Sequence, residues 1–346
     1  MYVTGSATSV ADLMTKIKDF CTNATAGYPA YTLLSFGTEG TGHRLHISKS
    51  GAANYFFNFR SVVNESVLGT PGLSGIYMNA GLDFYNSGST WYNQLYSFTY
   101  DNSSKYVISG INNITGEIVS YHFFYFKQTN NYDVVYIVVE SPSGSYQRLM
   151  FGIMDSASIH NEWSGNAPNG LFYNGSVSHN NVNYSLATSF FGSSDVGWQS
   201  GSPSGAVFAT FNTEGIYYTG WASGDFSIPQ NQMSEPTPQV FDMSMKMQSI
   251  FLCSPSTFSS MPPLHPVTIC ATANTTSTMN NSTPWYPIGT LPNVYMVNMF
   301  NISSGATITI GSDTYKVFPF RKKSDTWSGT SPNNGTYRFG YAIKTS

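Results

Sequence analysis

The sequence is poor in charge. Only 10% of its 346 residues are Asp, Glu, Lys or Arg, against about 25% in an average soluble protein. The net charge is −3, so the chain as a whole has no attraction for the phosphate backbone of nucleic acids. The one basic cluster, Arg321-Lys322-Lys323, is typical of a solvated strand end. We therefore expect no nucleic-acid partner.

Cysteine is also scarce, and long apolar runs are missing. Cys21, Cys253 and Cys270 show no Cys-x-x-Cys or Cys/His spacing, so we expect neither a zinc site nor a disulfide framework. Cys253 and Cys270 could pair across two strands or remain reduced core thiols. No window reaches about 18 uninterrupted apolar residues, and no basic stretch precedes an apolar run at the start. We expect neither a membrane span nor a signal peptide.

Aromatic residues are abundant, with 24 Tyr and 24 Phe. Together with many Val and Thr, they favour strands over helices. We expect a mainly β fold with a minor α+β N-terminal part, built from antiparallel sheets in a sandwich-like arrangement. A weakly charged, Tyr-rich surface is also typical of extended protein contacts, because Tyr provides contact area at low rotamer cost.

The clearest helix is predicted over residues 9–21. Ser9 can cap it, and Asp12 follows three residues later, as in a capping box. Apolar residues recur at helical spacing and form one face: Val10, Leu13, Met14, Ile17 and Phe20. Cys21 closes this helix and is expected to be buried.

A hairpin is predicted from His43 to Ser61, with a polar turn at residues 49–51. Its second half alternates so that three aromatic residues share one face, namely Tyr55, Phe57 and Phe59. Such a face must be covered, and we expect the N-terminal helix to pack on it.

Further strands follow from alternating or fully apolar segments. We predict an antiparallel meander of residues 117–127, 132–140 and 146–153, and a hairpin over residues 306–319. Residues 69–81, rich in Gly and Pro, are predicted to form a loop. Other strand candidates cover residues 31–36, 91–100, 105–109, 206–212, 215–221, 250–253, 267–271, 294–299 and 337–343.

Three regions differ in composition. Residues 1–154 form the predicted N-terminal α+β domain, and residues 241–346 form a C-terminal β domain. Residues 155–240 are rich in Gly, Ser, Asn and Pro, and we expect loops with short strands there. Ordered loops of this length are uncommon inside a compact monomer, so neighbouring subunits are expected to supply contacts to them.

Motifs for catalysis or cofactor binding are missing. There is no His-Glu-x-x-His, no Gly-x-Ser-x-Gly elbow, and no phosphate-binding or dinucleotide fingerprint. His43 and His46 are three apart on a strand and face opposite sides, so they cannot easily share a metal ion. A glycoside hydrolase would need two carboxylates, for which Glu162 and Asp225 are the candidates. We expect no enzyme activity, cofactor or metal.

Surface aromatic and basic residues are the candidates for contacts between subunits. We predict this role for Trp198, Tyr217, Tyr218, Trp221, Arg321, Lys322 and Lys323. The same Tyr and Trp residues between Gly197 and Asp225 could instead bind a carbohydrate on a host surface.

Three blocks of sequence carry a resemblance to a known group. They are Gly5–Leu13 leading to Gly42–Ile47, Arg148–Gly152, and Ile310–Pro319 running to Gly340–Ile343. Together they resemble virion structural proteins of tailed bacteriophages, encoded among head, neck and tail genes. The resemblance implies a non-enzymatic homo-oligomer in the virion, bound to copies of itself and to other virion proteins. A place in the neck, tail or baseplate is expected; the alternatives are a capsid decoration protein or a receptor-binding tail module.

Overall fold

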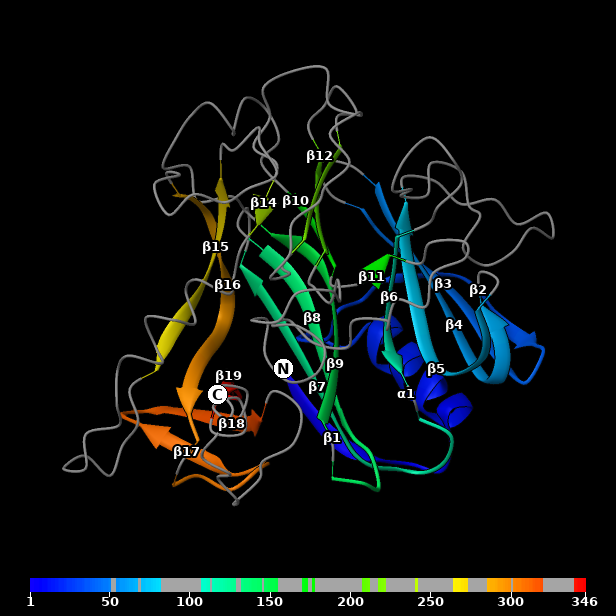
Figure 1. The fold of residues 1–346 in the computed structure, drawn as a ribbon, viewed down its shortest axis with the longest axis horizontal. Coiled ribbons are helices and arrows are strands. Elements are labelled where there is room, and N and C mark those ends of the chain that lie inside the picture. Colours follow the sequence, from blue (N-terminus) through cyan, green and yellow to red (C-terminus); the bar gives the residue numbers. More distant parts are fainter. Residues whose placement is uncertain are drawn as a thin grey trace, which may run out of the picture.

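In the computed structural model the chain forms three antiparallel sheets and a short helix (Figure 1). The residues that the structure describes are 1–50, 54–67, 70–81, 107–112, 114–128, 132–144, 146–154, 170–173, 176–177, 207–211, 217–221, 240–241, 264–272, 285–299, 301–319 and 339–346. The predicted mainly β fold, with an N-terminal helix packed on a sheet, is confirmed.

The N-terminal sheet has six strands in the order β11-β6-β5-β4-β3-β2. Along the chain its strands are β2 (Thr32–Glu39), β3 (Gly42–Ser50), β4 (Asn54–Val67), β5 (Thr70–Gly81), β6 (Val107–Asn112) and β11 (Ser176–Val177). The central sheet has seven strands in the order β1-β7-β8-β9-β10-β12-β13. These are β1 (Tyr2–Ala7), β7 (Ile118–Gln128), β8 (Tyr132–Glu140), β9 (Tyr146–Met154), β10 (Gly170–Tyr173), β12 (Val207–Phe211) and β13 (Tyr217–Trp221).

The C-terminal sheet has six strands in the order β14-β15-β16-β19-β18-β17. They are β14 (Val240–Phe241), β15 (His265–Thr272), β16 (Trp285–Asn298), β17 (Thr307–Ile310), β18 (Asp313–Pro319) and β19 (Phe339–Lys344). The predicted hairpin is present as β17 and β18, and Pro319 lies at a strand end.

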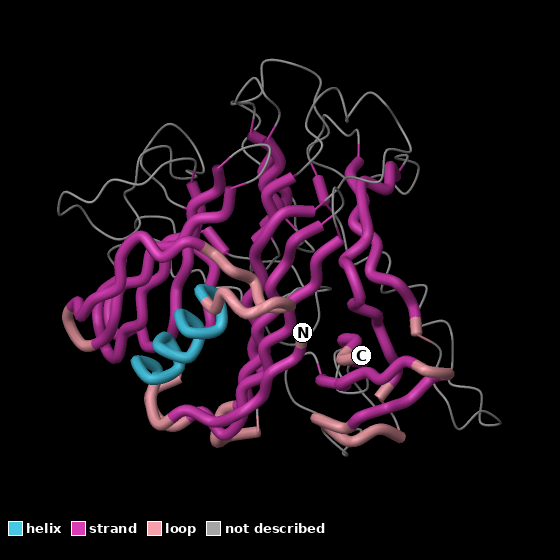
Figure 2. The backbone as a smooth tube through the Cα atoms, turned by 180° about the vertical axis from the view of Figure 1, so that it is seen from behind, coloured by secondary structure: helices cyan, strands magenta, loops and turns pink. Residues whose placement is uncertain are grey.

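Helix α1 (Val10–Thr22) begins after the predicted cap, since the Ser9 hydroxyl accepts a hydrogen bond from the Asp12 amide at 3.1 Å. Its apolar face is buried, and Cys21 with it. The helix packs on β3 and β4, and Figure 2 shows it lying across the strands of the N-terminal sheet. Tyr55, Phe57 and Phe59 are each at most 2% exposed, as predicted for an aromatic face that must be covered.

The middle of the central sheet, where β7, β8 and β9 lie side by side, is buried on both faces. One face meets the N-terminal sheet, where the rings of Phe57 and Phe151 lie 5.0 Å apart. The other meets the C-terminal sheet, where Phe318 lies 4.9 Å from the His122 ring and 5.6 Å from the Tyr146 ring. Strands buried on both sides are apolar at consecutive positions, which explains the runs Phe123-Phe124 and Val134–Val139.

Two predictions about local structure are wrong. The loop predicted over residues 69–81 is instead a strand from Thr70 to Gly81, because β5 pairs along most of its length with β4. Two of its glycines lie at β-bulges. Gly72 and Gly75 have positive φ where the register between β4 and β5 shifts, a backbone conformation that bulges often need. Lys49 is not in a turn but pairs with Tyr55 inside the β3–β4 ladder.

The sequence prediction also missed β1, which pairs with β7 more than a hundred residues away. Two strands of the middle region, β12 and β13, extend the central sheet through β10. The division into three domains stays a prediction. The predicted strands at residues 91–100 and 250–253 lie outside the described residues.

Candidate functional site

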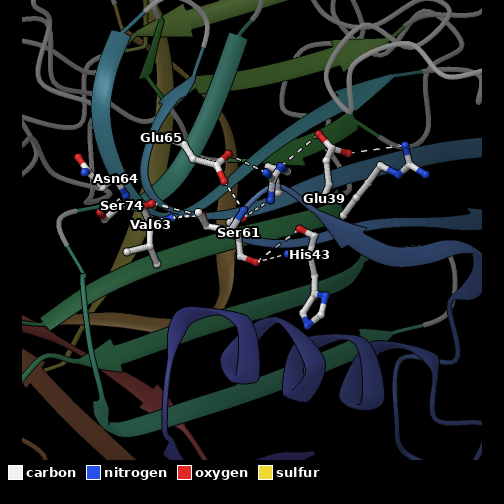
Figure 3. A network of polar contacts seen from close by, with 10 residues as sticks. Glu39, His43, Ser61, Val63, Asn64, Glu65 and Ser74 are labelled. Atoms are coloured by element: carbon white, nitrogen blue, oxygen red, sulfur yellow. Dashed lines mark hydrogen bonds and ion pairs between the residues drawn. The ribbon is translucent and has the colours of Figure 1, made fainter.

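In the described part of the chain, buried charged side chains occur in three groups, which we consider as candidate sites. The first surrounds Arg60 on β4, whose side chain is only 4% exposed. Its Nε donates to Glu39 Oε1 at 3.2 Å and its Nη2 to Glu65 Oε2 at 2.7 Å (Figure 3). We call Glu39, Thr41, Arg60 and Glu65 the Arg60 cluster. It joins the end of β2 to the irregular half of β4.

The Arg60 cluster also holds the turn between β2 and β3. The Thr41 amide donates to Glu65, and the Thr41 hydroxyl accepts from the Val63 amide at 2.9 Å. A Cβ at Gly42 would overlap the Ser61 carbonyl, so the backbone approaches there as closely as glycine permits. The turn is therefore fixed to a second strand and does not depend on its own backbone bonds alone.

The electrostatics of the cluster favour the ionised form of Glu65. Burial of Glu65 opposes its ionisation, but hydrogen bonds from Thr41 and the charge of Arg60 outweigh burial and lower its pKa. Glu39 also lies 3.6 Å from Arg44 Nη1. Two arginines and two carboxylates thus neutralise one another at this end of the N-terminal sheet.

Replacing Arg60 with lysine is expected to destabilise the fold by about 1–2 kcal/mol, because an ammonium cannot donate along two directions of a planar fork. The free energy of unfolding in urea measures this. The matched substitution Arg44→Lys, at a residue 30% exposed, should cost less than about 0.5 kcal/mol. Equal losses in both variants would show that the fork geometry of Arg60 is unimportant.

The second place joins the N-terminal and central sheets. Lys49 Nζ lies 3.2 Å from Asp133 Oδ2, and both side chains are only about one-tenth exposed (13% and 11%). The Tyr125 hydroxyl donates to the same carboxylate oxygen at 3.1 Å. Burial, followed by the charge of Asp133, raises the pKa of Tyr125. The pair binds β3 to β8 within an otherwise aromatic interior.

The Cys21 side chain on helix α1 is fully buried. Burial raises the pKa of this thiol, and the nearby charge of Lys49 offsets burial only in part. Because the thiolate is the reactive form, Cys21 is a packing residue and not an activated nucleophile.

The third place joins the central and C-terminal sheets. Arg148 on β9 is 1% exposed, its guanidinium lies 3.9 Å from the centre of the Tyr341 ring, and its Nη2 donates to the Pro319 carbonyl at 2.5 Å. Burial lowers the pKa of Arg148, and burial raises the pKa of Tyr341 to about 12. A cation stacked on an aromatic face is a strong contact when desolvated.

Sequence reasoning did not single out Arg60, Asp133 or Arg148 as important charges. The available signal was a charged residue inside a strand whose neighbours are apolar, as in the run from Arg148 to Phe151. The predicted opposite orientation of two histidines is seen: the His43 ring lies 5.0 Å from Phe36, whereas His46 bonds Asn58 at 2.7 Å.

The predicted contact residues fall at one edge or outside the described part. Tyr217, Tyr218 and Trp221 lie on β13, the last strand in the order of the central sheet. Trp198, Arg321, Lys322 and Lys323 lie outside the described residues. So do Glu162 and Asp225, the carboxylates considered for a hydrolase. The described residues therefore bring three of the seven onto one strand.

Among the described residues, no group of three or more His, Cys, Asp or Glu side chains could hold a metal ion. Within the same part of the chain, no helix has the length and apolarity needed to cross a membrane. No known protein-family model matches this chain, and a search of curated proteins finds no relative.

Proposed function

We propose that this chain is a non-enzymatic structural subunit of a tailed-bacteriophage particle, assembling as a homo-oligomer in the neck, tail or baseplate region. The observation that carries the proposal is how the buried charges are used. Arg60, Lys49 with Asp133, and Arg148 each join one strand or sheet to another part of the same chain. Such contacts stabilise the packing of strands and sheets, and they leave these charged groups unavailable for chemistry on a substrate.

The exterior supports the same proposal. Only 10% of the residues are charged, and Leu33 on β2 and Val119 on β7 are large apolar side chains that are 45% and 48% exposed. The buried cores of protein interfaces are depleted of charged residues relative to the rest of the surface. Symmetric assemblies repeat each contact many times, so each contact can be modest.

The test is the composition of purified particles. Mass spectrometry of virions of the encoding phage should find this chain in multiple copies, and gold-labelled antibody should place it in the neck, tail or baseplate. Labelling over the capsid surface would favour a decoration protein. Absence of the chain from washed particles would overturn the proposal.

A second candidate, a glycan-binding tail module, draws support from the placement of Tyr217, Tyr218 and Trp221 on the single strand β13. An array of host-surface glycans decides between the two. Binding that is lost in a Trp221→Ala variant would favour the module.

A further inference from the structure

Strand β2 forms one edge of the N-terminal sheet. Among the described strands it pairs with β3 alone, and the sheet order ends with it. The strand has eight residues, Thr32 and Thr38 are exposed, and Leu33 is 45% exposed. Figure 1 shows β2 at the outer side of this sheet, away from the central strands. An exposed edge of this length presents unpaired backbone groups to other strands.

The features that usually protect an edge strand are few here. β2 contains no Lys, Arg or Pro, and its only charge, Glu39, is directed back to Arg60 and Arg44. One protective feature is present, a register shift between Leu33 and Ser35. From Ser35 to Glu39 the ladder with β3 is regular. Those five residues form the part of the edge that can accept a new strand.

Side-chain contacts hold both faces of this segment in place. The Arg60 cluster fixes the turn after Glu39 to β4, and Lys18 Nζ lies 5.1 Å from the centre of the Phe36 ring on the helix side. A pre-organised edge loses little conformational entropy when it pairs. The Arg60 cluster therefore keeps this edge in a pairing-competent shape.

The alternation of backbone groups shows which of them point outward. Glu39 and Gly42 flank a two-residue turn, and the pair closing such a turn is hydrogen-bonded. In an antiparallel ladder hydrogen-bonded and non-hydrogen-bonded pairs alternate. Glu39, Gly37 and Ser35 thus bond to β3, while Phe36 and Thr38 direct their backbone groups outward. The centre of the regular segment is Gly37, where an added Cβ would meet nothing within 4 Å.

The segment is complementary to itself when paired antiparallel about a two-fold axis at Gly37. Phe36 and Thr38 of each copy would exchange backbone hydrogen bonds, and the two Gly37 residues would face each other about 4.5 Å apart between Cα atoms. The two Glu39 carboxylates would then lie about 14 Å apart along the strands. Parallel pairing in register would instead place these like charges side by side.

Charge also favours a second copy as the occupant. Arg44 pairs with Gly37 across the ladder, and Gly37 has no side chain to obstruct it. The Arg44 side chain is 30% exposed, and its Nη1 lies 3.6 Å from Glu39 Oε2 of the same chain. In the two-fold arrangement Glu39 of the second copy would lie opposite Ser35, on the same face as Arg44. Each arginine could then reach a carboxylate of the other copy.

We propose that β2 pairs antiparallel with β2 of a second copy of this chain, with Gly37 on the two-fold axis. The inference rests on the proposed homo-oligomer and specifies one of its contacts. Five paired residues bury less than the roughly 1,200 Å² at the lower end of stable interfaces. We therefore expect a weak contact in solution that is strengthened by other contacts in the assembly.

Cysteine cross-linking tests the register. Gly37→Cys, in a Cys253→Ser/Cys270→Ser background that retains the buried Cys21, should form a covalent dimer under mild oxidation at high protein concentration. The facing Cα atoms at about 4.5 Å fall within the range that disulfides span. The control Gly116→Cys, also at an open position, should not form one. Equal cross-linking at both positions would overturn the inference.

A charge variant tests the same contact without cysteine. Gly37→Lys leaves the monomer intact, because the position is open, but places two ammonium groups face to face across the axis. Analytical ultracentrifugation should show self-association weakened at least tenfold, and Gly37→Ala should associate like the wild type. Self-association unchanged by Gly37→Lys would overturn β2 pairing while leaving the homo-oligomer in place. A chain absent from virions would instead overturn the proposed function.

Discussion

Replacing Gly152 with alanine is expected to destabilise the protein by about 3–5 kcal/mol, or to prevent folding, because strained backbone and steric overlap add together. Gly152 lies on β9 in the middle of the central sheet and has a φ of 143°. A Cβ there would overlap the carbonyl of Asp133 and the Cα of Val134 on β8. These are backbone atoms in the part of the sheet that is buried on both faces, so they cannot move aside at low cost.

The measurement is urea unfolding followed by far-ultraviolet circular dichroism. Gly37→Ala is the matched control, because it is also a glycine inside a strand but has open space where the Cβ would go. We expect the control to change stability by less than about 1 kcal/mol, and toward stabilisation, since alanine restricts the unfolded chain. If Gly152→Ala unfolded at the wild-type urea concentration, the close approach of β9 and β8 would be contradicted.

Acid is expected to destabilise the fold between pH 7 and pH 4 through two buried histidines. Burial, with a further contribution from the charge of Arg44, lowers the pKa of His46 to about 4, although its bond to Asn58 opposes the shift. Burial and then the charge of Lys316 lower the pKa of His122 to about 4. The side chains are 2% and 6% exposed. Both sites therefore hold neutral imidazole in the folded state.

The direction of the pH effect on stability follows from the number of protons that each state binds. Below a pKa near 6.5 the unfolded chain takes up protons at both histidines, whereas the folded chain does so only near pH 4. The unfolded state thus binds more protons, and stability falls as pH falls through this window. At pH 5 each histidine should cost about 2 kcal/mol, so the two together cost about 4 kcal/mol.

Urea unfolding at pH 7 and pH 5 measures this loss. His46 is hydrogen-bonded to Asn58, and His122 to the Tyr2 hydroxyl at 2.8 Å. The double variant His46→Gln/His122→Asn keeps polar groups at both positions, and most of the difference between the two pH values should disappear. A wild-type protein equally stable at both pH values would contradict the burial of His46 and His122.

Local patterns were sufficient where the partners are close in sequence. Helix α1 was predicted from Ser9, Asp12 and one apolar stripe, and its boundaries moved by one residue. The meander β7-β8-β9 was predicted because its strands are consecutive and its turns are short. The C-terminal hairpin followed from alternation about its turn.

Long-range pairing was not predictable in the same way. β1 is a strand because it pairs with β7. Apolar and polar residues do not alternate clearly enough within Tyr2–Ala7 to predict a strand there. β5 contains the signals of a loop, but its glycines provide positive φ at bulges opposite β4. Of the candidate contact residues, only those on β13 lie within the described part, so their role stays a prediction.

The sequence by itself determined the class of fold, the helix and its buried face, and the strands whose neighbours follow directly in the chain. Those features depend on periodicity and turn chemistry, which are local properties. Only the tertiary structure decided that Arg60, Asp133 and Arg148 join strands and sheets, and that β2 is left at an edge. These facts depend on which strands and sheets pack against one another. That packing is decided by contacts between residues far apart in the sequence, such as Arg148 and Pro319, which are more than a hundred positions apart.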